Sequence, residues 1–387
     1  MAYIPYSCQN VDDDDIAAVV EVLRSEYLTQ GPAVGRFEAA FARAHEVPHA
    51  VAVANATCGL HIGCLALGVG PGSRVWTSPN SFLASANCAL YCGASVDFVD
   101  IDPVSRNMSV DALRAKLDRA ASRGELPNVL IPVDFSGLPC DLREMRELAD
   151  RYGFRILEDA SHATGASYLD RPVGSDHADV TVFSLHAVKV ITSAEGGVVT
   201  TRDPVIDKNL RLLRSHGMTR DLEALQNAPE GPWVYEQQIL GFNYRLTDMQ
   251  AALGESQLKR MGAMQRAREA LTMQYDELLA DLPLRLPMRL ADRRSSWHLY
   301  VIEVDHDRCA TTRGAVFSAL RQAEIGVNVH YIPIHLQPFY ASMGFKRGDF
   351  PASERYYAGA ISLPLFPALT TTQQEHVADT LRAAVAG

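Results

Sequence analysis

One stretch near the middle of the chain decides the fold, and it reads Arg155-Ile-Leu-Glu-Asp-Ala-Ser-His162. It begins as a short apolar run of the β type and ends in two acids and a histidine. Similar apolar runs occur on both sides of it, separated by Gly, Pro, Asp and Ser residues and by amphipathic stretches. Strands are expected at residues 50–54, 74–77, 95–99, 129–133, 155–157, 180–184 and 197–201.

Helices are expected between most of these strands. They fall at residues 57–67, 81–91, 110–120 and 142–152. Parallel strands need crossover connections, and these helices pack on the faces of the sheet that they connect. The pattern therefore predicts an α/β fold with a large, mostly parallel sheet that is covered on both faces.

The pattern changes after residue 202. A helix is expected at 204–213, a polar segment at 221–231 and a long helix at 247–282. The remainder predicts a smaller α+β unit, with strands at 298–304 and 326–330 and helices at 313–323 and 371–384. We expect an N-terminal helix and arm over residues 1–25, a large domain over 26–250, and a linking helix with the small domain over 251–387.

The composition excludes several classes of protein. The 387 residues carry 36 basic and 46 acidic side chains, a net charge of −10, which disfavours binding to nucleic acid or anionic lipid. No apolar run reaches the roughly 20 residues that cross a bilayer, and no secretory signal is expected, so we predict a cytoplasmic protein. The seven cysteines are an odd, dispersed set, and we expect reduced thiols and no metal site.

Lysine is scarce, with five residues against 31 arginines, so its placement is informative. Charged or plainly polar residues lie within two positions of the other four lysines, whereas the neighbours of Lys189, Val188 and Val190, are apolar. Apolar surroundings lower the pKa of a lysine, and only the neutral amine attacks a carbonyl carbon. Lys189 is therefore a candidate Schiff-base residue; the alternative is a loop lysine that extends its charged end to solvent.

Asp159 and His162 follow the expected strand 155–157, at the end of the sheet where ligands of α/β proteins bind. Asp159 either caps the next helix or holds a proton on a heteroaromatic nitrogen. The cofactor pyridoxal phosphate (PLP) needs such an acid, because its protonated ring is the electron sink. His162 would then contact the phenolic oxygen of the ring.

A phosphate site is expected where Asn55-Ala56-Thr57 begins a helix, because backbone N–H groups and a hydroxyl lie there at the positive end of the helix dipole. Thr57 is alternatively only a helix cap. Ser184 provides a second hydroxyl, and Phe82 either stacks on a flat ring or lies in the core. Dinucleotide, P-loop and nucleophile-elbow motifs are absent from the sequence.

These motifs, in this order, resemble those of the DegT-type nucleotide-sugar aminotransferases, which are PLP enzymes of fold type I. The matching stretches are residues 27–32, 55–57, 158–162, 183–189, 195–197 and 241–248. The resemblance implies that Lys189 binds PLP as a Schiff base and that the enzyme is a homodimer with shared active sites. It assigns Asp159 to the pyridine nitrogen, His162 to the phenolic oxygen, Phe82 to the ring face, Ala56, Thr57 and Ser184 to the phosphate, and Asn243 to the phosphate held by the partner subunit.

The resemblance also implies a set of substrate contacts. Arg245 is the first choice for the substrate diphosphate and Arg220 the second, although Arg245 alternatively pairs with Asp248. The other candidates are loop and small-domain residues expected near the sugar and glutamate. They are Thr29, Gln30, His186, Tyr244, His330, Tyr331 and His335.

Within the family, residues 28–33, 84–93 and 327–338 resemble the UDP-sugar 4-aminotransferases of pseudaminic acid biosynthesis. This group implies transfer of the amino group of L-glutamate to the 4-keto group of a UDP-linked 2-acetamido-2,6-dideoxy-hexos-4-ulose. Leu185 and Ala187 depart from it, since the group usually has Phe and Pro there. Alternatives are another 4-keto or 3-keto sugar on UDP, TDP or GDP, or a PLP-binding relative without turnover; sugar 3-dehydrases of the family carry His in place of the lysine.

Overall fold

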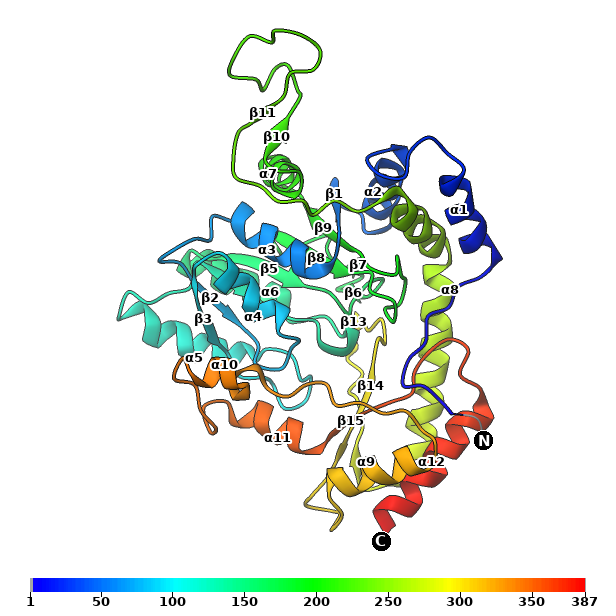
Figure 1. The fold of residues 1–387 in the computed structure, drawn as a ribbon. Helices are drawn as coiled ribbons and strands as arrows, with labels where there is room; N and C mark the ends of the chain where they lie inside the picture. Colours follow the sequence, from blue (N-terminus) through cyan, green and yellow to red (C-terminus); the bar gives the residue numbers. More distant parts are fainter. Residues whose placement is uncertain (1–2, 387) are drawn as a thin grey trace.

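The computed structural model describes residues 3–386 and contains a seven-stranded sheet in the order β1-β9-β8-β5-β4-β2-β3 (Figure 1). All its strands are parallel except β9, which is antiparallel to both β1 and β8. The strands are β1 (His49–Val53), β2 (Arg74–Thr77), β3 (Ser95–Phe98), β4 (Val129–Ile131), β5 (Arg155–Asp159), β8 (Val180–Ser184) and β9 (Gly197–Thr201). Each of the seven predicted strands is therefore confirmed to within two residues at its ends.

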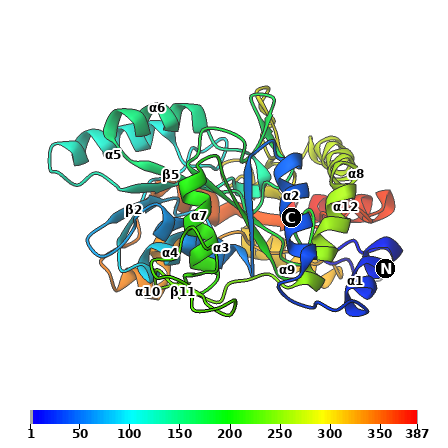
Figure 2. The same ribbon diagram turned by 90° about the horizontal axis from the view of Figure 1, so that it is seen from above.

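Helices cover both faces of this sheet (Figure 2). Side chains alternate between the faces along each strand, so Val75 packs with one helix layer and Trp76 with the other. The first layer is α3 (Ala56–Ala66), α4 (Ala84–Tyr91) and α7 (Pro204–Arg214). The second layer is α2 (Pro32–Ala44), α5 (Val110–Ala121), α6 (Leu142–Tyr152) and the start of α8 (Asp248–Leu279).

The long helix α8 connects the two parts of the chain (Figure 1). Thr247 caps it, accepting a hydrogen bond from the Gln250 N–H. Ala251 near its start packs in the large core, and Tyr275 near its end packs in a second core. This second core lies under β12 (Leu284–Arg285), β14 (Tyr300–Val304), β15 (Ala360–Leu363), α9 (Arg313–Gln322) and α12 (Thr371–Ala386).

The strand predicted at 326–330 was wrong. Of that segment only Asn328 pairs with a strand, in an isolated bridge to Ser362. The N–H of Gly326 instead donates to the Ile4 carbonyl, 2.7 Å away, because the N-terminal segment lies alongside it. A Cβ at Gly326 would come within 2.8 Å of the Ile4 oxygen. The adjacent N-terminal segment, which the sequence did not place, therefore takes the N–H of Gly326 in place of a strand neighbour.

A two-stranded hairpin projects from the large domain (Figure 1). It is formed by β10 (Met218–Thr219) and β11 (Glu236–Gln237), and it contains the predicted polar segment 221–231. We refer to residues 218–240 as the arm, which is separate from the N-terminal segment. The remaining elements are α1 (Asp13–Leu23), β6 (Ser167–Tyr168), β7 (Arg171–Pro172), β13 (Arg293–Arg294), α10 (Pro338–Ala341), α11 (Pro351–Gly359) and two single 3-10 turns at Phe135–Gly137 and Ile334–Leu336.

Within residues 3–386, no helix has the length and apolar character needed to cross a membrane. The seven cysteines are free thiols, five of them buried. No cluster of three potential metal-ligating side chains occurs in the same range. The cytoplasmic location and the division into three segments stay predictions.

Candidate active site

Asp159 is the last residue of β5 and is almost completely buried. One of its carboxylate oxygens accepts a hydrogen bond from the Ser85 hydroxyl at 2.6 Å. The other accepts one from the Ser161 N–H at 3.1 Å. The carboxylate thus closes the turn after β5, as a cap does, but it also lies at the carboxyl end of the sheet among ionisable side chains.

Lys189 follows β8 in a turn in which its N–H donates to the His186 carbonyl. Its side chain is partly buried, and its Nζ lies 3.4 Å from Nε2 of His298. Burial lowers the pKa of Lys189 to about 8, while the negative charge of Asp159 acts in the opposite direction. A substantial fraction of this amine is therefore neutral near pH 8, as a Schiff-base lysine requires.

His162 lies between these two groups and the small domain. Its Nε2 is 3.1 Å from the Tyr331 hydroxyl, and its Nδ1 accepts a hydrogen bond from the Ser136 N–H at 3.3 Å. Burial and the nearby positive charge of Lys189 hold the pKa of His162 well below its usual range. The ring is neutral and able to orient another polar group.

Phe82 is not a core residue, since 59% of its surface is exposed. Its ring lies 6.3 Å from that of Tyr331. The interpretation of Phe82 as a core aromatic is therefore wrong, and its exposed face is available to a flat ligand.

The start of α3 fits a phosphate group. Its cap is Asn55, whose side chain accepts a hydrogen bond from the Cys58 N–H at 2.9 Å, so Thr57 is not the cap. Within the described chain, the N–H groups of Ala56 and Thr57 donate to no other group. Ser184 is buried and is the last residue of β8, at the end of that strand. Free N–H donors at a positive helix end are the donor set that an anion requires.

The small domain contributes His330 and Tyr331, but His335 lies elsewhere. His330 is buried, its Nδ1 is 2.7 Å from the Ser362 hydroxyl, and burial lowers its pKa to about 4. His335 is completely buried, with Nε2 3.0 Å from the Glu354 carboxylate. The structure therefore gives His335 an internal partner and does not place it with the cluster around Lys189.

Residues 241–247 pass across the end of β1. Tyr244 accepts a backbone hydrogen bond from the Ala54 N–H, and its hydroxyl is 3.2 Å from Nδ1 of His61. Asn243 is exposed and forms an isolated bridge to Ser215. Arg245 forms a similar bridge to Val53 and is partly exposed.

Asp248 does not pair with Arg245 in the described chain. It accepts hydrogen bonds from the N–H groups of Gly31 and Ala33, at 2.8 and 2.9 Å, and so caps the start of α2. The interpretation of Arg245 as the ion-pair partner of Asp248 is wrong. Arg245 is left with its charge available to a ligand.

Four predicted substrate residues lie at the surface. His186 is exposed and lies 3.8 Å from the Glu195 carboxylate. Arg220 lies in the arm, 5.9 Å from the centre of the Tyr235 ring. The exposed loop before α2 contains the other two, Thr29 and Gln30. His186 shares the turn of Lys189, whereas no hydrogen bond or ion pair within residues 3–386 joins Thr29, Gln30 or Arg220 to Lys189.

Sequence reasoning missed His298, which contacts Lys189 directly. It stands in an apolar run, Trp297-His-Leu-Tyr300, where a histidine is as compatible with a satisfied core position as with a site. Only its three-dimensional position beside a lysine 109 residues away distinguishes the two.

An α/β fold that places a low-pKa lysine, a buried acid and a helix N-terminus at one end of its sheet is that of an aminotransferase-type PLP enzyme. The chain belongs to the DegT/DnrJ/EryC1/StrS aminotransferase family, whose model matches residues 9–382. It is therefore an enzyme of the PLP-dependent sugar aminotransferase family. The resemblance to the DegT-type aminotransferases is confirmed for the family.

Three relatives illustrate the similarity. The spore coat polysaccharide biosynthesis protein SpsC of Bacillus subtilis is 37% identical over 390 residues, with 100% of this chain and 98% of the relative covered. Helicobacter pylori PseC, an aminotransferase involved in the biosynthesis of pseudoaminic acid, superposes with a TM-score of 0.90 at 30% identity, with 99% of each chain covered. The sugar aminotransferase Spr1654 of Streptococcus pneumoniae, described as putative and solved in a PMP form, gives 0.90 at 28% identity, again over 99% of each chain.

Proposed function

We propose that the protein transfers the amino group of L-glutamate to the 4-keto group of a UDP-linked 2-acetamido-2,6-dideoxy-hexos-4-ulose. The observation that carries the proposal is the amine of Lys189, with a pKa lowered to about 8, next to the buried carboxylate of Asp159. The sugar is suggested by the motifs at 28–33, 84–93 and 327–338 and by the similarity to PseC.

When bound, PLP supplies an electron sink that stabilises negative charge on the substrate carbon. Asp159 holds a proton on the pyridine nitrogen, and His162 orients the phenolic oxygen. The N–H groups of Ala56 and Thr57 hold the phosphate, together with the Ser184 hydroxyl. Phe82 covers the ring.

The reacting group of the chain is the Nζ of Lys189. In the half-reaction with L-glutamate the neutral amine removes the proton from the α-carbon of the substrate. In the half-reaction with the keto sugar the same group delivers a proton to C4 of the sugar. Arg245 contacts the substrate diphosphate, and Tyr331 and His330 contact the sugar from the small domain. Because His335 is buried against Glu354, its contribution is the position of the loop at 331–335 rather than a direct contact.

We propose a homodimer in which the arm contacts a second copy. Its apolar side chains are unusually exposed, with 81% for Leu240, 71% for Leu222 and 67% for Trp233. Several large apolar side chains exposed on one projecting segment are typical of an interaction site. Asn243 follows the arm directly and would then reach the phosphate in the partner subunit, while Arg220 would reach the partner's substrate.

A second candidate function is the same chemistry on another 4-keto or 3-keto nucleotide sugar. Leu185 and Ala187 depart from the pseudaminic group beside the lysine, and SpsC shares more identity with this chain than PseC does. The two candidate functions differ in the nucleotide and the sugar of the acceptor, which a panel of keto sugars distinguishes.

The protein loaded with PLP and mixed with L-glutamate should release 2-oxoglutarate and change its absorption to that of pyridoxamine phosphate. Mass analysis with a panel of UDP-, TDP- and GDP-linked keto sugars then identifies the acceptor. Lys189→Ala should abolish both the glutamate-dependent change and the product. Wild-type protein that binds PLP but forms no 2-oxoglutarate would show a binding protein without turnover.

A further inference from the structure

His298 is the described side chain that contacts the amine of Lys189. Its ring is buried, with Nε2 3.4 Å from Nζ, and its Nδ1 has no hydrogen-bond partner within residues 3–386. Burying a polar atom without a partner costs free energy, so such atoms are few in native proteins. The imidazole is thus held at this place without a structural hydrogen-bond network of its own.

The backbone around His298 is clamped by a loop of the large domain. The N–H of His298 donates to the Ser136 carbonyl and that of Ser296 to the Gly137 carbonyl, both at 3.0 Å. The Ser296 hydroxyl donates to the His162 carbonyl at 2.5 Å. Gly137 has φ +96°, and a Cβ there would come 2.1 Å from the Ser296 hydroxyl oxygen. The close approach of the two segments therefore requires glycine.

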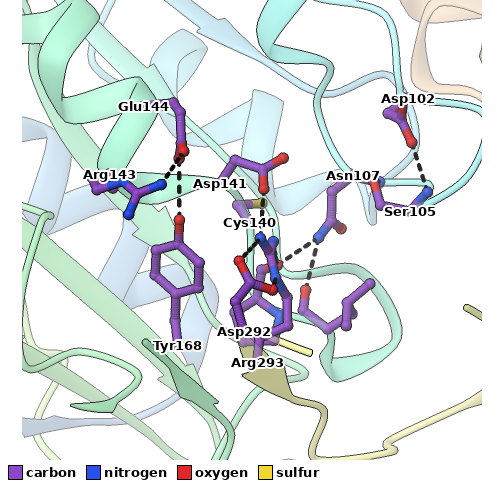
Figure 3. A network of polar contacts seen from close by, with 12 residues as sticks. Asp102, Ser105, Asn107, Cys140, Asp141, Arg143, Glu144, Tyr168, Asp292 and Arg293 are labelled. Atoms are coloured by element: carbon purple, nitrogen blue, oxygen red, sulfur yellow. Dashed lines mark hydrogen bonds and ion pairs between the residues drawn. The ribbon is translucent and has the colours of Figure 1, made fainter. Parts of the chain in front are cut away.

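The loop that contains Ser136 and Gly137 is itself held by hydrogen bonds from two side chains, those of Asn107 and Arg293 (Figure 3). The Asn107 amide donates to the carbonyls of Leu138 and Pro139, at 2.8 and 3.2 Å. Arg293 donates to the Pro139 carbonyl at 2.8 Å and to the Asp141 carboxylate at 2.6 Å. The position of His298 is thus defined by residues of both domains.

The residue before His298 has a strained backbone. Trp297 has φ +52°, a conformation that is costly for a bulky side chain. It is held there by a hydrogen bond from its indole N–H to Glu269, and the buried guanidinium of Arg268 donates to its carbonyl at 3.1 Å. Strain that the surroundings maintain in this way is typical of functional sites.

The groups facing the ring are basic or neutral. They are Lys189, His162, whose ring centre is 4.5 Å away, Arg268 and His330. Burial, and then these positive or ionisable neighbours, hold the pKa of His298 well below its usual range. The imidazole is neutral, so one of its nitrogens is an acceptor for an amine N–H.

We propose that His298 is a further catalytic residue of this site: its Nε2 accepts a hydrogen bond from the Nζ of Lys189 and holds the free amine in position for proton transfer. The proposal rests on the proposed function. It assigns the role to a residue that follows α8, so alignment of the lysine depends on the packing of that segment against the loop at Ser136 and Gly137.

The test compares His298→Leu, which removes the acceptor, with His298→Gln, whose amide oxygen reaches nearly the same place. His45→Leu is the matched control, because His45 is also a buried histidine, bonded to the Phe41 carbonyl outside this site. The first readout uses protein freed of PLP: the pH dependence with which Lys189 captures added PLP, trapped by borohydride. The second is the single-turnover rate of 2-oxoglutarate formation from glutamate.

For His298→Leu we expect the capture midpoint to move below that of the wild type, because the ammonium form loses an acceptor, and the single-turnover rate to fall at least tenfold. His298→Gln should recover most of both, and His45→Leu should match the wild type. An unchanged midpoint and rate in His298→Leu, or Gln as impaired as Leu, would overturn the proposal. If the Leu variant does not fold, His298→Asn, which is too short to reach Nζ, replaces it.

The two proposals fail in different ways. If wild-type protein loaded with PLP forms no 2-oxoglutarate from L-glutamate, the proposed function fails, but the capture midpoint of the His298 variants still decides the contact with Lys189. If the wild type turns over and the Leu variant matches it in both readouts, only the role of His298 is rejected.

Discussion

Gly197 packs directly against the peptide that joins Asn55 to Ala56, so closely that a Cβ at Gly197 would lie 2.8 Å from the Ala56 nitrogen. This contact joins the start of β9 to the start of α3. It explains why a glycine stands at the first residue of a buried strand, where a β-branched residue is otherwise favoured. The proposed phosphate donors are therefore placed by a strand neighbour as well as by their own helix.

Gly197→Ala should weaken PLP binding. The added methyl group must displace the Asn55–Ala56 peptide, and this moves the N–H groups that hold the phosphate. We expect at least a tenfold higher dissociation constant for PLP, about 1.4 kcal/mol, measured by fluorescence titration of protein freed of cofactor. Gly70→Ala is the control, since a Cβ at Gly70 meets nothing within 4 Å. Equal affinity in the two variants would contradict this account of the phosphate site.

The capture of PLP by Lys189 should follow pH with a midpoint near 8. Burial lowers the pKa of Lys189 to about 8, so the neutral amine is the minor form at pH 7 and the major form at pH 9. Asp159→Asn should lower this midpoint, because the Asp159 charge favours the ammonium form. Borohydride-trapped incorporation, measured by mass at each pH, provides the profile. A midpoint near 10.5, the ordinary pKa of a lysine, would show that the site does not perturb the amine.

The sequence predicted the strands that carry Asp159 and precede Lys189 for a physical reason. Asp159 ends β5 and Lys189 lies a few residues after β8, and the apolar pattern of both strands is local, so the sheet edge near them can be inferred from short windows. The mostly parallel sheet follows from the same repeats. Even so, the reversed direction of β9 was not predicted, because the pattern of a buried strand does not report its direction.

The rest of the site depends on contacts between distant segments. His298 reaches Lys189 only because the loop at Ser136 and Gly137 fixes the segment before β14. Likewise, the N-terminal segment takes the N–H of Gly326 at the start of the strand predicted at 326–330. Neither relationship leaves a periodic signal. His335 shows the converse, since a histidine in a family motif proves to be an internal partner of Glu354.

Glu158 and Asp134 form a buried acid pair beneath the site. Glu158 accepts from the Thr181 hydroxyl at 2.7 Å and Asp134 from the Cys140 N–H at 2.8 Å, while one oxygen of each has no partner in the described chain. Burial, opposed for Asp134 by its hydrogen bonds, raises the pKa of Asp134 to about 7 and that of Glu158 well above its usual range. The folded protein therefore retains a proton that the unfolded chain has lost.

This pair should make the protein less stable as the pH rises from about 4 to about 7. With raised pKa values in the folded state, the free energy of unfolding falls over this window by up to about 1.4 kcal/mol per pH unit for each proton. Glu158→Gln should flatten the dependence, measured as the difference in unfolding free energy between variant and wild type at each pH. The buried histidines contribute equally to both proteins, so they cancel. Parallel curves would exclude a shared proton.

Shared active sites make a quantitative prediction for mixed dimers. If each site combines Lys189 of one subunit with Asn243 of the other, then Lys189→Ala and Asn243→Asp each inactivate every site of their own homodimers. A mixed dimer then has one site in which both changes meet and one intact site, because the two intact residues come from different subunits. Random mixing of equal amounts should restore about a quarter of the wild-type activity per total protein.

The experiment mixes the two inactive proteins under mild denaturation, allows subunits to exchange, and measures product formation over time. The control mixes Lys189→Ala with Asp159→Asn: by the proposed roles both residues serve the same subunit's site, so each site of that mixed dimer carries one change and activity should not rise. The two pairs therefore separate residues that act across an interface from residues that act within one chain. No recovery in the Asn243 pair despite mixed dimers detected by mass would place Asn243 outside the partner's site, and recovery in the control pair would show that Lys189 and Asp159 serve different sites.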